Sequence, residues 1–367
     1  MRTRPLAHAR AVGVDGWLWA GTLLTAAVAG VAAQAAVSPV LKFLTALAAI
    51  ALSAAVMTRT IDQLGQRLRA TAVGLFQAVT GNLPELIIGI FALRQGLVTV
   101  VQAALIGSVL SLLLFGNGLA FVVGGLRHGP LGIDANRAQV TRVTLVLMVA
   151  TLVAPAVAVN LHAAAAAHTH AVSYVCAAAL LTVFALALPS KIRGESGDAS
   201  AAVGEAVSTL QPRPAASLPR TLTLLGVAGL LTAVEADWLT ADLAPAITTL
   251  HLNSGFVGLF IVAIVGNLSQ FAPAVRLAAR GDADTATAIN MEGALQVALM
   301  LAPLLVVIAP LTGATAFTLI FPPLQVVAVI LAVVLVVFVT IDGKINHMEG
   351  VMLIALYVVL GSLFWWS

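Results

Sequence analysis

The chain has 367 residues, of which 60% are apolar and only 9% are charged, whereas roughly a quarter of the residues in a soluble domain are charged. A mean hydropathy of +1.05 means that most of the sequence faces lipid or protein rather than water, which excludes an ordinary soluble enzyme. The net charge of +3 comes from basic residues scattered between apolar runs, so nucleic acid is not an expected partner and a lipid bilayer is.

Residues 14–36 are the first apolar run, and they follow a short basic segment. The run is longer than the apolar part of a signal peptide, so we expect it to be retained as a membrane span. Ten further runs are long enough to cross roughly 30 Å of hydrocarbon as helices. They occupy residues 40–58, 70–93, 97–125, 138–160, 171–189, 220–246, 254–278, 285–311, 315–341 and 348–366. The expected fold class is an all-α polytopic membrane protein with eleven transmembrane helices.

The distribution of basic residues gives the predicted orientation, because Lys and Arg collect in cytoplasmic loops. With the N-terminus in the cytoplasm and the C-terminus outside, sixteen of the eighteen basic residues are cytoplasmic and only Lys42 and Arg94 are not. Residues 190–219 are the one long polar segment and are rich in Gly, Ser, Pro and Ala. This composition predicts a flexible cytoplasmic linker between two halves.

The two halves resemble each other weakly at a fixed offset of 185 residues, at which Gly81-Asn82-Leu83 aligns with Gly266-Asn267-Leu268. Six of the thirty positions in 81–110 match. Five predicted spans separate the two motifs, so the motif helices run in opposite directions, which indicates an inverted repeat of the kind found in secondary transporters. The predicted domains are an N-terminal segment with the first span (1–36), a first five-helix repeat (37–189), the linker (190–219) and a second five-helix repeat (220–367).

Glu85 is the clearest candidate site residue, because a carboxylate at membrane depth costs roughly 2.5–3.5 kcal/mol on insertion scales. It lies in FQAVTGNLPELIIGIFAL, where Gly81 weakens the helix and Pro84 removes a backbone donor. Asn82 lies three residues earlier on the same helix face. Because hard cations prefer oxygen ligands, this pattern predicts a cation site whose acid takes up a proton in the opposite phase.

In the second half, Gln270 stands where the repeat predicts an acid, and an amide carries no charge and exchanges no proton. Glu292 lies in the next predicted span, four residues before Gln296, and corresponds by the offset to Gly107, beside Ser108. We interpret Glu292 as a replacement for the missing charge. The alternative is that Glu292 lies near the membrane surface and is simply hydrated.

Three more acids, Glu235, Asp237 and Asp242, lie near the outer end of the seventh predicted span. They would either draw cations into an outer vestibule or be hydrated at the interface. Three polar residues are interpreted as hydrogen-bond partners between helices rather than as ligands: Gln102, Asn117 and Gln325.

The segment GNLPELIIGIFALRQGLVTVVQAALIGSVLS resembles the first signature repeat of the calcium/cation antiporter superfamily, in its calcium/proton exchanger branch. VGLFIVAIVGNLSQFAPAV, followed by ALQVALMLAP, resembles the second, and DGKINHMEGVMLIALYVVL resembles the segment that opens the last span. The resemblance implies one helix plus two inverted five-helix repeats, and export of a cytosolic cation, chiefly calcium, in exchange for protons. It implies no cofactor and a location in the inner or plasma membrane of a bacterium. By position, Glu85 matches the first family acid, and Asn82 and Asn267 match the signature amides.

The second signature departs from the family pattern: Gln270 replaces its acid, Phe271 replaces a histidine, and Glu292-Gly293-Ala294 replaces a Gly-Ser-Ser run. Calcium prefers about six to eight oxygen ligands and binds more tightly as their charge rises. If Glu292 reaches the site, calcium/proton exchange is expected. Otherwise the single charge suits a monovalent cation, or the protein is a transport-silent scaffold retained for sensing or partner binding.

No nucleophile–base pair or nucleotide-binding loop is found, so the chain is expected to be a secondary transporter rather than an enzyme. Glu85 and Glu292 are the predicted metal ligands. The full set of predicted cation- and proton-binding residues is Glu85, Glu292, Asn82, Gln270, Asn267, Gln296 and Ser108.

Overall fold

Helices account for nearly all of the chain, because a helix satisfies its own backbone groups where water is absent. The computed structural model describes residues 5–65, 80–193, 217–314 and 316–366. The first half contains α1 (Pro5–Gln34), α2 (Pro39–Gly65), α4 (Leu83–Arg94), α5 (Val98–Leu110), π-helical η1 (Ser111–Gly116), α6 (Asn117–His128), α7 (Ala135–Asn160), the short 3₁₀ turn η2 (Ala164–His168) and α8 (Thr169–Arg193). The second half contains α10 (Leu218–Leu250), α11 (Ser254–Phe256), π-helical η3 (Val257–Val262), α12 (Ala263–Gly266), α13 (Leu268–Ala278), α14 (Ala283–Gln296), π-helical η4 (Val297–Leu301), α15 (Ala302–Ile308), 3₁₀ η5 (Ala309–Thr312), α16 (Pro323–Val339) and α17 (His347–Trp365).

Within the described ranges, eight helices are long and apolar enough to cross a membrane, or nine if the bent pair Ser254–Gly266 and Leu268–Ala278 is one span. The predicted span 315–341 is shortened at its start, because α16 begins only at Pro323. Pro322 and Pro323 favour an extended entry followed by a helix start. Residues 66–79, where the predicted span 70–93 begins, and most of the predicted linker 190–219 lie outside the described residues.

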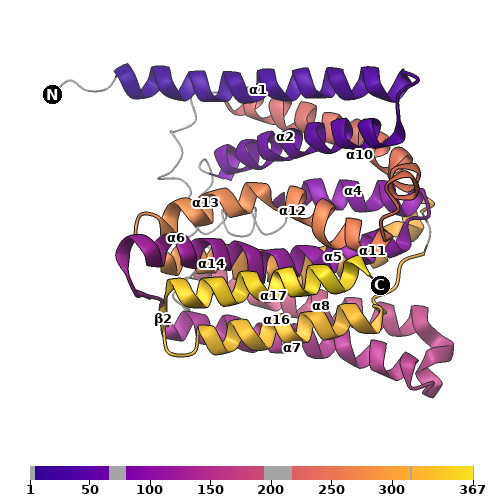
Figure 1. The fold of residues 1–367 in the computed structure, drawn as a ribbon, viewed down its shortest axis with the longest axis vertical. Helices are drawn as coiled ribbons and strands as arrows, with labels where there is room; N and C mark the ends of the chain where they lie inside the picture. Colours follow the sequence, from indigo (N-terminus) through magenta and orange to yellow (C-terminus); the bar gives the residue numbers. More distant parts are fainter. Residues whose placement is uncertain (1–4, 66–79, 194–216, 315, 367) are drawn as a thin grey trace.

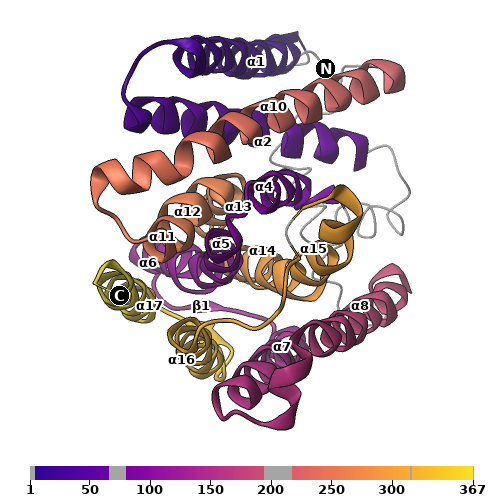
Figure 2. The same ribbon diagram turned by 90° about the vertical axis from the view of Figure 1, so that its right-hand side faces the viewer.

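The helices form three groups, seen most clearly in Figure 2. α1, α2 and α10 lie on one side, α7, α8 and α16 on the opposite side, and α4 to α6 with α11 to α15 between them. α2 packs against both α1 and α10, and α4 packs against α10, so the outer group adjoins the central helices. The central helices carry most of the buried apolar side chains.

Glycines allow the closest helix contacts, as in many membrane proteins. A Cβ atom added at Gly107 of α5 would lie 2.2 Å from the backbone oxygen of Leu259 in η3. A Cβ atom added at Gly350 of α17 would lie 2.7 Å from the backbone oxygen of Gly118 in α6. The α5–η3 contact joins the two halves of the chain directly.

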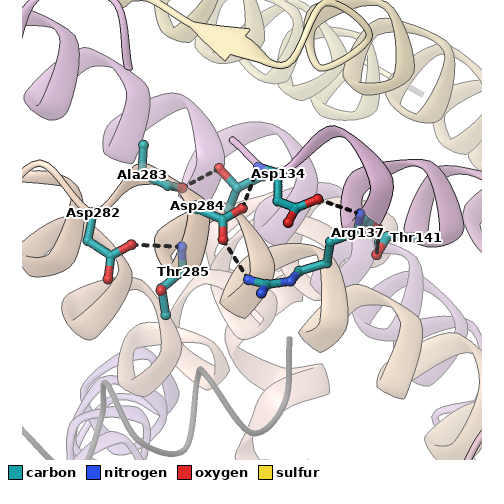
Figure 3. A network of polar contacts seen from close by, with 8 residues as sticks. Asp134, Arg137, Thr141, Asp282, Ala283, Asp284 and Thr285 are labelled. Carbon is teal, nitrogen blue, oxygen red and sulfur yellow. Dashed lines mark hydrogen bonds and ion pairs between the residues drawn. The ribbon is translucent and has the colours of Figure 1, made fainter. Parts of the chain in front are cut away.

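Turns from both halves are tied together at one end of the bundle. A two-residue strand β1 (Leu131–Gly132) pairs antiparallel with β2 (Lys344–Ile345), a small addition to the expected all-α fold. Beside it, the Arg137 guanidinium forms an ion pair with Asp284, and the backbone N–H of Asp134 donates to the same carboxylate (Figure 3). These contacts join the start of α7 to the start of α14.

The tail motif that resembles the family segment forms the start of α17. The Asn346 side chain accepts a hydrogen bond from the Glu349 backbone N–H at 3.1 Å, and Glu349 Oε2 accepts one from the Asn346 backbone N–H at 2.7 Å. This reciprocal pair is a capping box. Gly343, with φ of +71°, supplies the left-handed turn just before β2.

Candidate functional site

Both signature asparagines stand where a helix is interrupted. The Asn82 backbone, at φ −107° and ψ 24°, precedes α4, and the Asn267 backbone, at φ −92° and ψ 4°, precedes α13. At Asn267 the helix bends by 58°. In each case the asparagine backbone oxygen accepts from the N–H four residues later, at 3.0 Å for Leu86 and 3.1 Å for Phe271. The same local structure therefore recurs at the two Gly-Asn-Leu motifs.

Glu85 lies in the first turn of α4 and faces a cavity of about 50 Å³. Its Oε2 atom is shielded from solvent and has no hydrogen-bond partner. Gly266 of α12 lies opposite, because a Cβ atom built there would be 3.9 Å from Glu85 Oε1. In the cavity, the Glu85 carboxylate of the first half thus faces Gly266 of the second half, which has no side chain.

The cavity walls come from both halves and are mainly apolar. Glu85, Ser108 and Thr240 supply side-chain oxygens, and Glu85 is the only acid among the residues that line it. The described residues that line the cavity are Glu85, Ile88, Gly89, Ala92, Val100, Val101, Ala104, Leu105, Ser108, Leu239, Thr240, Leu243, Val262, Gly266, Leu301 and Leu305. A charge on Glu85 is therefore poorly hydrated, and an uncompensated charge in such surroundings is costly.

Amide side chains link the halves beside this cavity. Asn82 Nδ2 donates to Gln296 Oε1 at 3.2 Å, and Asn267 Nδ2 donates to Ser111 Oγ at 3.4 Å and to the Ala263 backbone oxygen at 2.8 Å. Asn82 Oδ1 is buried and accepts no hydrogen bond. That oxygen is a free acceptor three residues before Glu85.

Gln270 does not mirror the free carboxylate of Glu85. Its Nε2 atom donates to Asn267 Oδ1 at 3.3 Å. A Cβ atom added at Gly293 would lie only 2.2 Å from Gln270 Oε1, so the amide fits against the side-chain-free surface of α14. Gln270 is thus held within the second half by a hydrogen bond and by close packing.

Glu292 is half-buried on α14 and is not among the residues that line the cavity. It is one helical turn before Gln296, whose side chain contacts Asn82. Of the seven predicted site residues, Glu85 and Ser108 therefore line the cavity, and Asn82, Gln296, Asn267 and Gln270 lie in the adjoining amide contacts. In the described part of the chain, no group of three or more His, Cys, Asp or Glu side chains is placed to hold a metal ion.

The sequence reasoning missed the contribution of α10 to the cavity. Thr240 and Leu239 line it, but neither residue has a pattern that distinguishes it from an ordinary buried helix position. The hydrated interpretation was wrong for Glu235, which is completely buried, whereas Asp237 is exposed.

The expected interhelical bond is confirmed for Asn117, whereas Gln102 bonds instead to the extended segment before α16. Gln102 donates to the backbone oxygens of Thr318 and Ile320, and Asn117 accepts from Asn290.

Comparison with known proteins identifies the family of this chain. The model of the family described as "Sodium/calcium exchanger protein" matches residues 38–193 and 221–366. The chain belongs to that family. It is therefore a membrane transporter rather than an enzyme, and the two matched ranges leave out the polar segment between the halves.

Among its relatives, the family member is 30% identical over 334 residues to the Ca²⁺/H⁺ antiporter of Aphanothece halophytica, covering 88% of this chain and 89% of that protein. It is 31% identical over 292 residues to the Ca²⁺/H⁺ antiporter ChaA of Bacillus subtilis, covering 78% of this chain and 81% of that protein. The solved structure of native YfkE superposes with a TM-score of 0.79 at 26% identity, covering 95% of this chain and 98% of that one. These relatives confirm the resemblance to the calcium/proton exchanger branch.

Proposed function

We propose that this family member is a calcium/proton antiporter that works by alternating access, with the Glu85 carboxylate binding the cation in one phase and a proton in the other. The observation that carries the proposal is the buried Glu85 Oε2 atom, which has no hydrogen-bond partner among the described residues and lies in a cavity with mainly apolar walls. Such a carboxylate is stable only when a proton or a cation neutralises it. The names of the relatives described above point to the same pair of ions.

Coupling follows if the two ions compete for the same oxygens. A cation on Glu85 excludes the proton, and the proton excludes the cation. The empty, ionised site would be a bare charge in a cavity with mainly apolar walls, and its high free energy would disfavour movement between the two access states. Exchange then occurs only when the site is occupied by one ion or the other.

The proposed architecture is one helix followed by two inverted five-helix repeats, eleven spans in all. The 185-residue offset supports it, because α4, α5 and α6 begin at Leu83, Val98 and Asn117, and α13, α14 and α15 begin at Leu268, Ala283 and Ala302. The turns agree as well, since Gly96 and Gly281 both have positive φ, of 75° and 89°.

The hydrogen bonds between the halves also follow the offset. At the offset of 185 residues, Asn82 corresponds to Asn267 and Ser111 corresponds to Gln296. The Asn82–Gln296 bond and the Asn267–Ser111 bond therefore join equivalent positions of the two proposed repeats, with the roles of the halves reversed. Two reciprocal bonds of this kind are expected of an approximate two-fold axis. We place the substrate site at that axis, near the membrane midplane.

Further ligands are proposed around Glu85. Ser108 lines the same cavity, Asn82 Oδ1 is an unused acceptor, and Gln296 and Asn267 hold the adjoining amides. Glu292 is proposed as the second acid, since calcium favours more than one carboxylate and Glu292 is one turn from Gln296. Gln270 is proposed to contribute its amide to the positioning of Asn267 rather than a charge.

A monovalent cation is the second candidate substrate. One observation favours it: Glu85 is the only acid among the cavity-lining residues. A single carboxylate offsets the dehydration of a singly charged ion better than that of calcium.

The proposed setting is the inner or plasma membrane of a bacterium, with the N-terminus in the cytoplasm. Arg137, Arg142 and Lys344, which belong to the predicted cytoplasmic set, lie at the end of the bundle that carries β1 and β2. This clustering at one end is what the cytoplasmic preference of basic residues predicts.

Reconstituted vesicles test the function. Calcium, sodium or potassium is added outside vesicles that contain a pH-sensitive dye, and proton movement is compared for wild type, Glu85→Gln and Glu292→Gln. We expect calcium to drive proton movement in wild type and not in Glu85→Gln. Asp237→Asn, an exposed change of the same kind, is the matched control and is expected to behave as wild type.

The variants separate the alternatives. Loss of calcium-driven flux in Glu292→Gln supports Glu292 as the second acid. If sodium or potassium drives proton movement and calcium does not, the transported substrate is a monovalent cation rather than calcium. If none of the three ions drives proton movement in wild type, the proposal is contradicted and a transport-silent scaffold is favoured.

A further inference from the structure

Glu235 lies near the middle of α10, in contact with α2, and has no exposed surface. Neither of its carboxyl oxygens has a hydrogen bond of good geometry. The hydroxyl of Ser53, which is itself fully buried on α2, is a neighbour of the carboxyl group, and its Oγ atom likewise makes no hydrogen bond of good geometry to the described residues. A completely buried acid with one neutral neighbour is costly in any helix, so it calls for an explanation.

Among the described residues of the helices that pack against α10, no cation is placed to neutralise Glu235. On α2, Lys42 donates to the Ala33 backbone oxygen at 3.1 Å, and Arg59 has interactions of its own. These two side chains are eleven and six residues from Ser53, roughly 16 and 9 Å along the helix axis at 1.5 Å per residue. On α4, the Arg94 guanidinium lies over the Phe91 ring, 5.7 Å from its centre.

The remaining charged groups on these helices are acids or lie far away. α2 also carries Asp62, and α4 carries Glu85. α10 itself carries Asp237, which is exposed, Asp242, which is half-exposed, and Arg220, fifteen residues away. The described part of α1 from residue 16 onward contains no titratable side chain. The described residues around Glu235 therefore offer no positive charge, and a proton is the simplest means of neutralising its carboxyl group.

The buried acid is close to the cation cavity but separate from it. Leu239, four residues after Glu235 and on the same face of α10, lines the cavity, and so does the Thr240 hydroxyl. One helical turn, about 5 Å, separates the level of Glu235 from that of the cavity wall. A small rearrangement of α10 against α2 would bring the carboxyl group into contact with water in the cavity.

We propose that Glu235, with Ser53 as its hydroxyl partner, is a second exchangeable proton site between α2 and α10 that takes up and releases one proton in each transport cycle. The carboxylate gains a proton from water to form the neutral acid, which fits the dry α2–α10 contact, and returns the proton to water when the contact opens. The inference rests on the proposed antiport, and it adds a proton that never shares a site with the cation.

Counting protons per calcium tests this site. Vesicles are prepared with a pH difference of one unit and no membrane potential, and the calcium ratio at which net flux stops is measured. Each exchanged proton changes that ratio about tenfold. Glu235→Gln, a near-isosteric neutral change, is expected to lower the balancing calcium ratio about tenfold relative to wild type.

The matched control is Asp242→Asn, which makes the same chemical change two turns further along α10 at a half-exposed position. It is expected to balance at the wild-type ratio. A wild-type ratio in Glu235→Gln overturns the proton site while leaving the antiport intact. A shift of the same size in Asp242→Asn also overturns it, because the effect would then follow from any lost charge on α10. Wild-type vesicles with no calcium-driven proton flux would instead remove the proposed function itself, and the role of Glu235 with it.

A second measurement covers the case in which Glu235→Gln does not fold. The infrared spectrum of wild type is expected to contain a band from a protonated carboxyl group that shifts in Ser53→Ala, since that change removes the hydroxyl neighbour. The band is expected to weaken when calcium transport begins. A carboxyl band unchanged by both treatments overturns the proposal.

Discussion

The two Gly-Asn-Leu motifs have the same backbone and opposite chemistry. After Asn82, the acid Glu85 points into a cavity and has an unpartnered oxygen. After Asn267, the amide Gln270 donates back to Asn267 and packs against Gly293. A helix break therefore occurs at the motif in both halves, while only the first half presents a charge at that position.

This difference shows that the backbone break and the charge are separable at the two motifs. The break depends on local backbone geometry, which the Gly-Asn pair supplies equally in both halves. The charge depends on one side chain, and its loss is tolerated because the amide can satisfy its own donor within the second half. Five substitutions and one control variant test this difference between the two motifs.

Removal of the acid that lines the cavity is expected to have the largest effect. Glu85→Gln keeps the shape of the side chain and eliminates the charge that faces the cavity. The loss of a buried charged partner costs about 3 kcal/mol, which corresponds to roughly a hundredfold weaker cation binding. Isothermal titration of the purified protein with calcium measures it, and an unchanged affinity would remove Glu85 from the binding site.

Gly107→Ala tests the backbone contact between the halves. The added Cβ atom would lie 2.2 Å from the Leu259 backbone oxygen, so α5 and η3 must separate. Overpacking of this kind costs about 1–3 kcal/mol, which lowers the midpoint of thermal unfolding in detergent. Gly266→Ala is the matched control, because its Cβ atom would make an ordinary contact of 3.9 Å with Glu85. Equal losses in both variants would contradict the structural explanation.

Gln270→Glu restores to the second half the charge that the first half has. We expect calcium affinity to rise about tenfold, since a second carboxylate compensates more of the charge of a divalent ion. The same change removes the donor to Asn267 and places two oxygens together, so stability without calcium is expected to fall by about 1 kcal/mol. Calcium titration and calcium-free thermal unfolding give the two values, and a gain in neither affinity nor flux would show that position 270 lies away from the bound ion.

Removal of the side-chain hydrogen bonds between the halves is expected to have the smallest effects of these substitutions. Ser111→Ala removes one acceptor of Asn267 Nδ2, which still donates to the Ala263 backbone oxygen, so the expected loss is about 0.6 kcal/mol. Gln296→Ala leaves Asn82 Nδ2 without its partner and is expected to cost about 1–2 kcal/mol. Thermal unfolding of both variants in one detergent measures the order, and a larger loss in Ser111→Ala would reverse this interpretation.

The fold and the first-half site could be predicted largely from sequence, because their signals are local. Long apolar runs require helices in a bilayer, and the Gly81–Pro84 interruption beside Glu85 marks a break with an acid. The contribution of α10 could not be predicted, since Thr240 and Leu239 acquire their roles only when α10 packs near α4. The burial of Glu235 was missed for the same reason: its neighbour Ser53 is 182 positions away in the chain.

Hydropathy could not predict that α16 begins only at Pro323 either, because the extended residues before Pro323 are as apolar as those of a membrane span. Their backbone is satisfied by Gln102, whose amide donates to two carbonyl groups of that segment. Gln102 was expected to bond to another helix. Its partner, an extended stretch of backbone rather than a helix, has no sequence signature.

The capping box at the start of α17 changes how the tail motif is used to classify relatives. Asn346 and Glu349 bind each other's backbone, so the acid of this motif fixes where the final helix begins. Similarity in the tail motif therefore reflects the residue at which the final helix begins rather than the ion that is transported. Substrate assignments for diverged members should be weighted toward the residues around the two helix breaks, where Glu85 lines the cavity.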